Sequence, residues 1–146
     1  MQLSPNFSLA ELTRSETATA RGLSNDPMPR HLENLRRLAG VLEQTRTLVG
    51  KPVLVTSGYR SPPVNRAVGG VPNSAHALGF AADIRVDGMT AIELARRIRD
   101  SAIRYDQLIL ETGRRIVHIS VDPRGRQQDL TQRGGPGTPI EQGIAA

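Results

Sequence analysis

Two histidines and one aspartate stand inside or beside short apolar runs, and this pattern constrains the fold more than any other feature. His76 and Asp83 belong to the segment 74–83, and His118 lies in the segment 117–120. Two neutral imidazole nitrogens and one carboxylate oxygen suit a borderline ion such as Zn²⁺. Three protein ligands leave a fourth position open for water, which separates catalytic zinc sites from structural ones. A fold that brings these three residues together is therefore expected to form a hydrolytic type of metal centre.

The order of local signals predicts an α+β fold, with helices packed on one face of a small, mainly antiparallel sheet in a single compact domain. A Ser-x-x-Glu capping box at Ser8 predicts a short first helix, and apolar residues at three- and four-residue steps from Leu32 to Leu42 predict a long helix ending at Gly50. The stretch from Glu16 onward is polar and predicts irregular structure. The remaining predicted elements are strands at 52–57, 81–86, 107–111 and 116–120, a short helix through 62–68, and a helix from Thr90 with Leu94, Ile98 and Ile103 on its apolar face.

The chain of 146 residues is long enough for one hydrophobic core. We expect one domain at 1–125, which contains all three candidate metal ligands, and a tail rich in Gly, Gln and Arg at 126–146. The tail is predicted to be partly ordered at most, with one strand near Leu130 and a frayed end. The absence of cysteine excludes disulfides and thiolate metal ligands.

The formal net charge is +5, and Lys51 is the only lysine among the basic residues. A basic balance favours an anionic partner. The arginines are dispersed, however, and do not alternate with aromatic residues, so neither nucleic acid nor a membrane is predicted as the partner. No basic and apolar leader stands at the N-terminus, and no run approaches the ~20 apolar residues of a membrane helix. We expect a monomer that is made in the cytoplasm.

The spacing of the later strands places a carboxylate near the third ligand. If Gly113 and Arg114 form the tip of a hairpin, Glu111 faces Ile116 and residue 109 faces His118. Side chains two apart on a strand share a face, so Glu111 and His118 point the same way as diagonal neighbours. A glutamate beside a zinc ligand, itself not a ligand, is suited to act as general base. Glu111 is therefore the candidate base.

Four ordered motifs resemble the zinc D-Ala-D-Ala metallopeptidases, a family that includes D-alanyl-D-alanine carboxypeptidases, D-Ala-D-Ala dipeptidases and phage L-alanyl-D-glutamate endolysins. The motifs read TSGYRS at 56–61, NRAVGG at 65–70, SxHxxGxAxDI at 74–84 and VHIS at 117–120. The resemblance extends from about residue 7 to about residue 122. The pattern is most similar to small, single-domain phage or prophage members.

The resemblance implies that His76, Asp83 and His118 bind one Zn²⁺ ion. It also implies that Arg60 binds a substrate carboxylate or carbonyl and stabilises the oxyanion, with Tyr59 and Ser74 contributing to substrate binding or to the loops around it. Such a protein hydrolyses an amide bond in the peptide stem of bacterial peptidoglycan. D-Ala-D-Ala and L-Ala-D-Glu both stay open as the bond cut, as do the native metal and the route by which the protein reaches the wall.

Two departures from the family pattern keep other functions open. Arg115 stands three residues before His118, where several members place the catalytic acid, and Ile116 stands where related sequences often have Trp. One alternative is a catalytically silent zinc-binding module that recognises cell wall or protein. The other is an arginine-rich nucleic-acid-binding or structural phage protein. The third histidine, His31, lies outside every motif and is expected on a helix surface.

Overall fold

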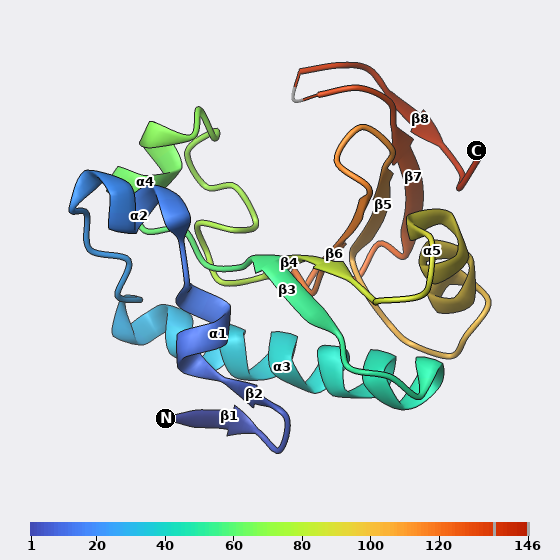
Figure 1. The fold of residues 1–146 in the computed structure, drawn as a ribbon, viewed down its shortest axis with the longest axis horizontal. Helices are drawn as coiled ribbons and strands as arrows, with labels where there is room; N and C mark the ends of the chain where they lie inside the picture. The colour runs from blue at the N-terminus through green and yellow to red at the C-terminus, as the bar shows by residue number, and fades with distance from the viewer. Residues whose placement is uncertain (136, 146) are drawn as a thin grey trace.

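A six-stranded sheet organises the molecule, whose computed structural model describes residues 1–135 and 137–145 (Figure 1). The strand order is β3-β4-β6-β5-β7-β8, and every neighbouring pair is antiparallel except β5 and β7. The expected α+β class with a mainly antiparallel sheet is confirmed. The strands are β3 (Leu54–Ser57), β4 (Ala81–Arg85), β5 (Gln107–Glu111), β6 (Ile116–Ser120), β7 (Gln128–Gln132) and β8 (Ile140–Gln142).

The main core lies between one face of this sheet and the helices α3 (Pro29–Val49) and α5 (Ala91–Arg99). Because strand side chains alternate, Ile84, Val117 and Leu110 line up across three strands and point into this core. Each is fully buried, and burial of one such side chain contributes about 1.5–3 kcal/mol. The opposite face carries the intervening residues of the same strands.

Shorter elements precede and flank the sheet. The N-terminal segment forms a small hairpin of β1 (Gln2–Ser4) and β2 (Phe7–Ser8), which the sequence did not indicate. Three short helices complete the fold: α1 (Leu9–Thr13), α2 (Glu16–Arg21) and α4 (Pro62–Ala67). Figure 1 shows α2 and α4 together at the β3 end of the molecule, away from α5.

Several boundaries follow the predicted caps. The capping box between Ser8 and Glu11 forms at the start of α1, and Gly50 ends α3 with a φ of 68° that an L side chain rarely adopts. The prediction of irregular structure from Glu16 is wrong: the Ser15 hydroxyl accepts a hydrogen bond from Ala18 N and starts α2.

Two further observations concern the second half of the chain. Ile103 is buried in the core but follows α5, which ends at Arg99, so its place on that helix is a wrong prediction. The strand expected near Leu130 is β7, which lies beside β5, so the sheet continues past residue 125. Residues 136 and 146 of the tail lie outside the described residues. Among the described helices, none is both long and apolar enough to span a bilayer.

Two glycines provide a matched test of the packing. A Cβ at Gly58 would stand 2.4 Å from the Leu12 carbonyl oxygen, whereas a Cβ at the exposed Gly40 of α3 would meet nothing within 4 Å. We expect Gly58→Ala to lower the free energy of unfolding by about 1–3 kcal/mol through overpacking. Gly40→Ala should raise it by about 0.5–1 kcal/mol because alanine loses less backbone entropy in a helix. Urea unfolding measures both, and equal effects would contradict this packing.

Candidate metal centre

Strand register brings the carboxylate and one imidazole together. Asp83 on β4 pairs directly with His118 on β6, and both side chains point to the face opposite the α3 and α5 core. His118 Nδ1 lies 3.1 Å from Asp83 Oδ1. Asp83 is only 1% exposed, because the segment that carries His76 and the side chain of Arg60 lie against it. The antiparallel sheet thus fixes two of the three candidate ligands.

His76 reaches the same point from a tight turn before β4. The Ser74 carbonyl accepts hydrogen bonds from the backbone N–H groups of the next turn, and Gly79 ends the turn with a φ of 80°. His76 Nδ1 donates to the Gly58 carbonyl over 2.8 Å, which leaves Nε2 unprotonated in the neutral ring. That nitrogen lies 3.3 Å from Asp83 Oδ1. A backbone carbonyl therefore selects the tautomer that a metal requires.

The three side chains fit a metal ion by distance and by chemistry. One ligand atom from each of His76, Asp83 and His118 lies within 4.8 Å of the others. Asp83 Oδ2 is buried and accepts no hydrogen bond from any described residue. A buried carboxylate oxygen without a partner costs free energy, and a cation removes that cost. Two neutral nitrogens and a carboxylate are suited to Zn²⁺.

The protonation state of the cluster also suits a metal. Burial lowers the pKa of His76 below its ordinary value, although the Asp83 carboxylate opposes this shift. Burial acts to raise the pKa of Asp83, but the neighbouring imidazoles of His118 and His76 outweigh it and hold the pKa well below the ordinary value. At neutral pH the cluster therefore contains a carboxylate and an unprotonated His76, the forms that bind metal.

Two arginines approach the same carboxylate. Arg60 Nη2 lies 3.9 Å from Asp83 Oδ2, and Arg114 Nη1 lies 3.7 Å from it. The Arg60 backbone N–H also donates to the His76 carbonyl over 3.1 Å, so the Gly58–Arg60 segment and the His76 turn hold each other. The arginine expected from the resemblance is therefore beside the candidate ligands.

Glu111 lies on this same face in the predicted register. It pairs with Ile116, and residue 109 pairs with His118, as the hairpin prediction required. The carboxylate is buried, and its Oε1 accepts hydrogen bonds from Arg114 Nε, at 3.0 Å, and from Arg114 Nη2. Among the described residues no donor bonds to Oε2. One oxygen of Glu111 is thus held in place while the other is free to exchange a proton.

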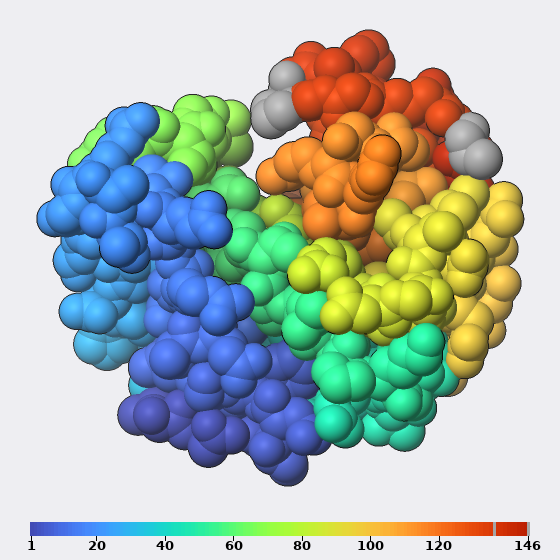
Figure 2. Space-filling view, in the orientation of Figure 1, coloured from blue at the N-terminus to red at the C-terminus, as the bar shows by residue number. Residues whose placement is uncertain are grey.

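A cleft of about 500 Å³ lies beside the cluster. Arg60 and Arg114, which both approach Asp83, form part of its lining. Figure 2 shows the hollow between the α2 and α4 side of the molecule and the β5–β6 hairpin. The other lining residues come from 14–17, from β3 and the loop after it, and from α4 and its following loop (Val64, Val68, Gly69 and Gly70).

The remaining predicted site residues support the loops. Tyr59 is one of the residues that line the cleft, but it is 1% exposed and its hydroxyl lies 3.1 Å from His31 Nδ1. Ser74 Oγ accepts from Ala77 N and contacts Asn65 Oδ1, which braces the His76 turn. The expected surface position of His31 is wrong: its side chain is buried under the Gly58–Arg60 segment because α3 turns it toward Tyr59.

Two residues of the site were not predicted from the sequence. Asn25 donates to the carbonyls of Thr13 and Tyr59 and accepts from Ser61 N, so it clamps the segment that carries Arg60. No local pattern could reveal it, because its partners are distant in sequence. Arg114 could have been found from the hairpin itself, because its three-residue spacing from Glu111 puts the two at the same turn.

Comparisons with known proteins agree with this geometry. The paired Asp83 and His118 on adjacent strands, with His76 on the preceding turn, form a site that could hold a metal ion. The family model described as Peptidase M15 matches residues 5–120, and the chain belongs to this family. The chain is also 33% identical over 96 residues to the zinc D-Ala-D-Ala carboxypeptidase of Streptomyces albus G. That match covers 65% of this chain but 37% of the relative, so the chain spans little more than a third of that protein.

Zinc content tests the ligand assignment. Alanine at position 76, 83 or 118 should abolish stoichiometric zinc binding, because each change removes one of three protein ligands. Asp87→Ala is the control, since it removes an exposed carboxylate outside the cluster. The metal content of chelator-stripped, zinc-reloaded protein gives the answer. Retention of zinc by all three alanine variants would refute the assignment.

The depressed pKa of His76 predicts a pH dependence of stability without metal. Because the folded-state pKa lies below the ordinary 6.5, the unfolded chain takes up the proton first as the pH falls. The stabilising contribution is therefore complete above about pH 6.5 and is lost on acidification below it. Urea unfolding with chelator present should show this loss in the parent protein and a smaller one in His76→Gln. A steeper loss in the variant would contradict the sign.

Proposed function

We propose that this protein is a zinc-dependent peptidase that hydrolyses an amide bond in the peptide stem of bacterial peptidoglycan. The observation that carries the proposal is the close set of His76, Asp83 and His118, with the unpartnered Asp83 Oδ2, beside a cleft whose lining includes three arginines. Membership of the peptidase M15 family and the similarity to a zinc D-Ala-D-Ala carboxypeptidase support the same reading.

The chemistry divides between the metal and the side chains around it. A zinc ion held by the three ligands would polarise the scissile carbonyl and make water a stronger nucleophile. Glu111 takes a proton from the attacking water at its free Oε2 and returns it to the leaving amine. Arg114 holds the other oxygen of that carboxylate and so fixes the direction in which the proton moves.

Arg60 supplies the positive charge for the substrate. A guanidinium stays charged at all relevant pH values and donates forked hydrogen bonds to a carboxylate or an oxyanion. The Arg60 side chain is only 16% exposed, and its backbone N–H donates a hydrogen bond to the His76 carbonyl. The position of the guanidinium is therefore fixed. A charge fixed in advance stabilises developing negative charge without reorganisation.

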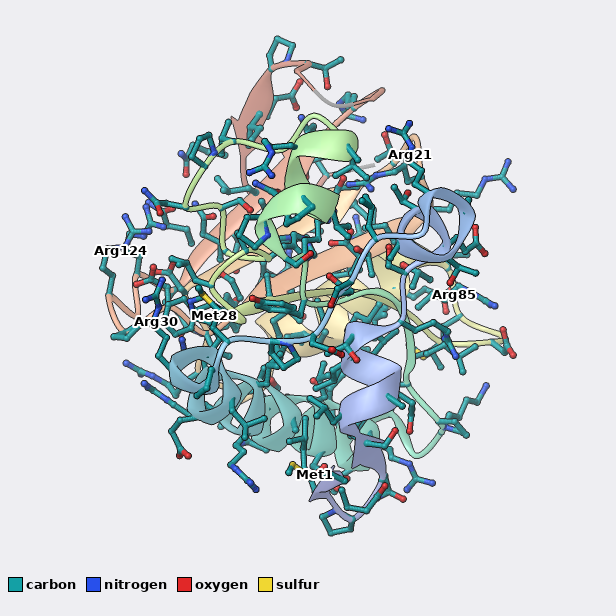
Figure 3. The ribbon with its side chains drawn as sticks, turned by 90° about the vertical axis from the view of Figure 1, so that its left-hand side faces the viewer. Met1, Arg21, Met28, Arg30, Arg85 and Arg124 are labelled. Atoms are coloured by element: carbon teal, nitrogen blue, oxygen red, sulfur yellow. The ribbon has the colours of Figure 1, made fainter. Side chains whose placement is uncertain are left out.

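The proposal leaves two bonds, D-Ala-D-Ala and L-Ala-D-Glu, as the candidates. It places the protein among small cell-wall hydrolases of phage or prophage type, made in the cytoplasm and acting on the wall. The charge pattern supports a wall substrate over a nucleic acid, because the arginines are dispersed along the sequence and do not alternate with aromatic residues. Figure 3 shows Arg21 and Arg85 on one side of the view and Arg30 and Arg124 on the other.

A silent zinc-binding module is the second candidate. The observation in its favour is Arg115, which occupies the position of the acid in several members of the family. The two functions separate in one assay of purified protein on peptidoglycan, run with zinc and after chelation, with released ends identified by mass. New amino termini or free D-Ala that vanish on chelation establish the peptidase and name its bond. Stoichiometric zinc with no cleavage of any wall type establishes the module.

Glu111→Gln should lower turnover by about 10²–10⁴-fold while zinc content stays stoichiometric, because only the proton acceptor is lost. Arg115→Gln is the control from the same hairpin and should leave turnover unchanged. Initial rates on a soluble stem peptide, paired with metal analysis of each variant, make the comparison. Unchanged turnover in Glu111→Gln would remove this residue from the mechanism.

A further inference from the structure

The cleft contains a third arginine that the metal centre does not use. Arg14 follows α1 and lines the same cavity as Arg60 and Arg114. Its Nη2 donates to the Val55 carbonyl over 3.3 Å, which holds the guanidinium against β3. Within the described part of the chain, no carboxylate lies within ion-pair distance of it. Arg14 thus presents an uncompensated charge to the cleft.

The other charges of the site balance one another. Arg114 is hydrogen-bonded to the Glu111 carboxylate, and Arg60 lies 3.9 Å from Asp83. These two cations and two anions cancel formally, so a divalent metal held by the three ligands would make the centre net positive. Glu16 lines the same wall as Arg14, but it is exposed and unpaired with it. The cleft is therefore built for a ligand with negative charge at more than one point.

The part of the cleft formed by α4 and the loop after it is suited to a peptide backbone rather than a bulky group. The exposed Val68 gives it apolar surface, and Gly69 and Gly70 leave the chain without side chains there. An extended peptide lying against this wall would run between the arginines at the metal centre and the segment 14–17. Charged donors that face such a groove bind carboxylates through short, charge-assisted hydrogen bonds.

We propose that Arg14 binds a free carboxylate of the substrate in the part of the cleft formed by residues 14–17. The substrate is then an acidic peptide with a carboxylate in addition to the group held by Arg60. This inference rests on the proposed function and deepens it, because it makes amidation of the stem peptide a determinant of binding. Two sources supply such a group, the glutamyl α-carboxyl and the C-terminal carboxyl.

The test is binding of three synthetic stem pentapeptides by titration calorimetry: the free acid, the glutamyl α-amide and the C-terminal amide. The zinc-loaded Glu111→Gln background limits hydrolysis during the titration. A charge-assisted hydrogen bond contributes about 1.5–3 kcal/mol, so Arg14→Gln should weaken binding of the free acid by about 10–100-fold. The same variant should leave one of the two amides unaffected, and that amide identifies the carboxylate. Arg14→Lys should restore part of the discrimination.

Arg21→Gln is the matched control, because Arg21 is an exposed arginine of α2 outside the cleft lining. Equal weakening of all three peptides by Arg14→Gln, or no weakening, overturns the role of Arg14, whatever the protein hydrolyses. Absence of any peptide binding overturns it as well. In a further outcome, Arg14 discriminates between the peptides but the parent protein does not hydrolyse the free acid. That outcome supports this inference and contradicts the peptidase function.

Discussion

The structure depends on a carboxylate buried in the middle of a β-sheet. Asp83 is 1% exposed, and one of its oxygens has no hydrogen-bond donor among the described residues. A buried unpaired charge is one of the costliest features a small domain can contain. Both imidazoles and both guanidiniums near it offset that cost only in part, since the guanidiniums stay beyond hydrogen-bond distance of that oxygen. The neighbouring elements hold the Asp83 carboxylate in a position where a cation can bind it.

The support for this carboxylate comes from segments far apart in the chain. Asn25 and the buried pair of His31 and Tyr59 fix the segment that holds Gly58 and Arg60. Gly58 in turn orients the His76 ring, and its own position depends on close contact with α1. A ligand that is oriented by a backbone carbonyl requires no reorganisation when metal binds. The N-terminal helices therefore belong to the site through packing, although they supply no ligand.

Strands and site residues were predictable from the sequence wherever a short-range rule, such as hairpin length or a helix cap, determines the structure. The register of Glu111 opposite Ile116 follows from hairpin length, and the ends of α1 and α3 follow from Ser8 and Gly50. The parallel pairing of β7 with β5 was not predictable, because it joins residues about 20 positions apart. The hydrogen bonds of Asn25 were not predictable either, because no local pattern points to its distant partner Tyr59. Helix α2 was missed although Ser15 provided its N-cap, since no apolar stripe accompanied it.

The hairpin geometry explains how Glu111 can serve where several relatives use a residue three positions before the last histidine. Arg115 has a φ of 55° and lines a cavity with Leu110 and the start of α5, on the helix-covered side of the sheet. Glu111 is paired with Ile116, two residues before His118, and so it shares the face of the ligands. An acid at position 115 of this chain would lie on the helix-covered side of the sheet, away from the candidate ligands. An acid at position 111 lies on the same face as the ligands. The loss of the usual acid is therefore compatible with catalysis, because the strand across the hairpin supplies a carboxylate to the same space.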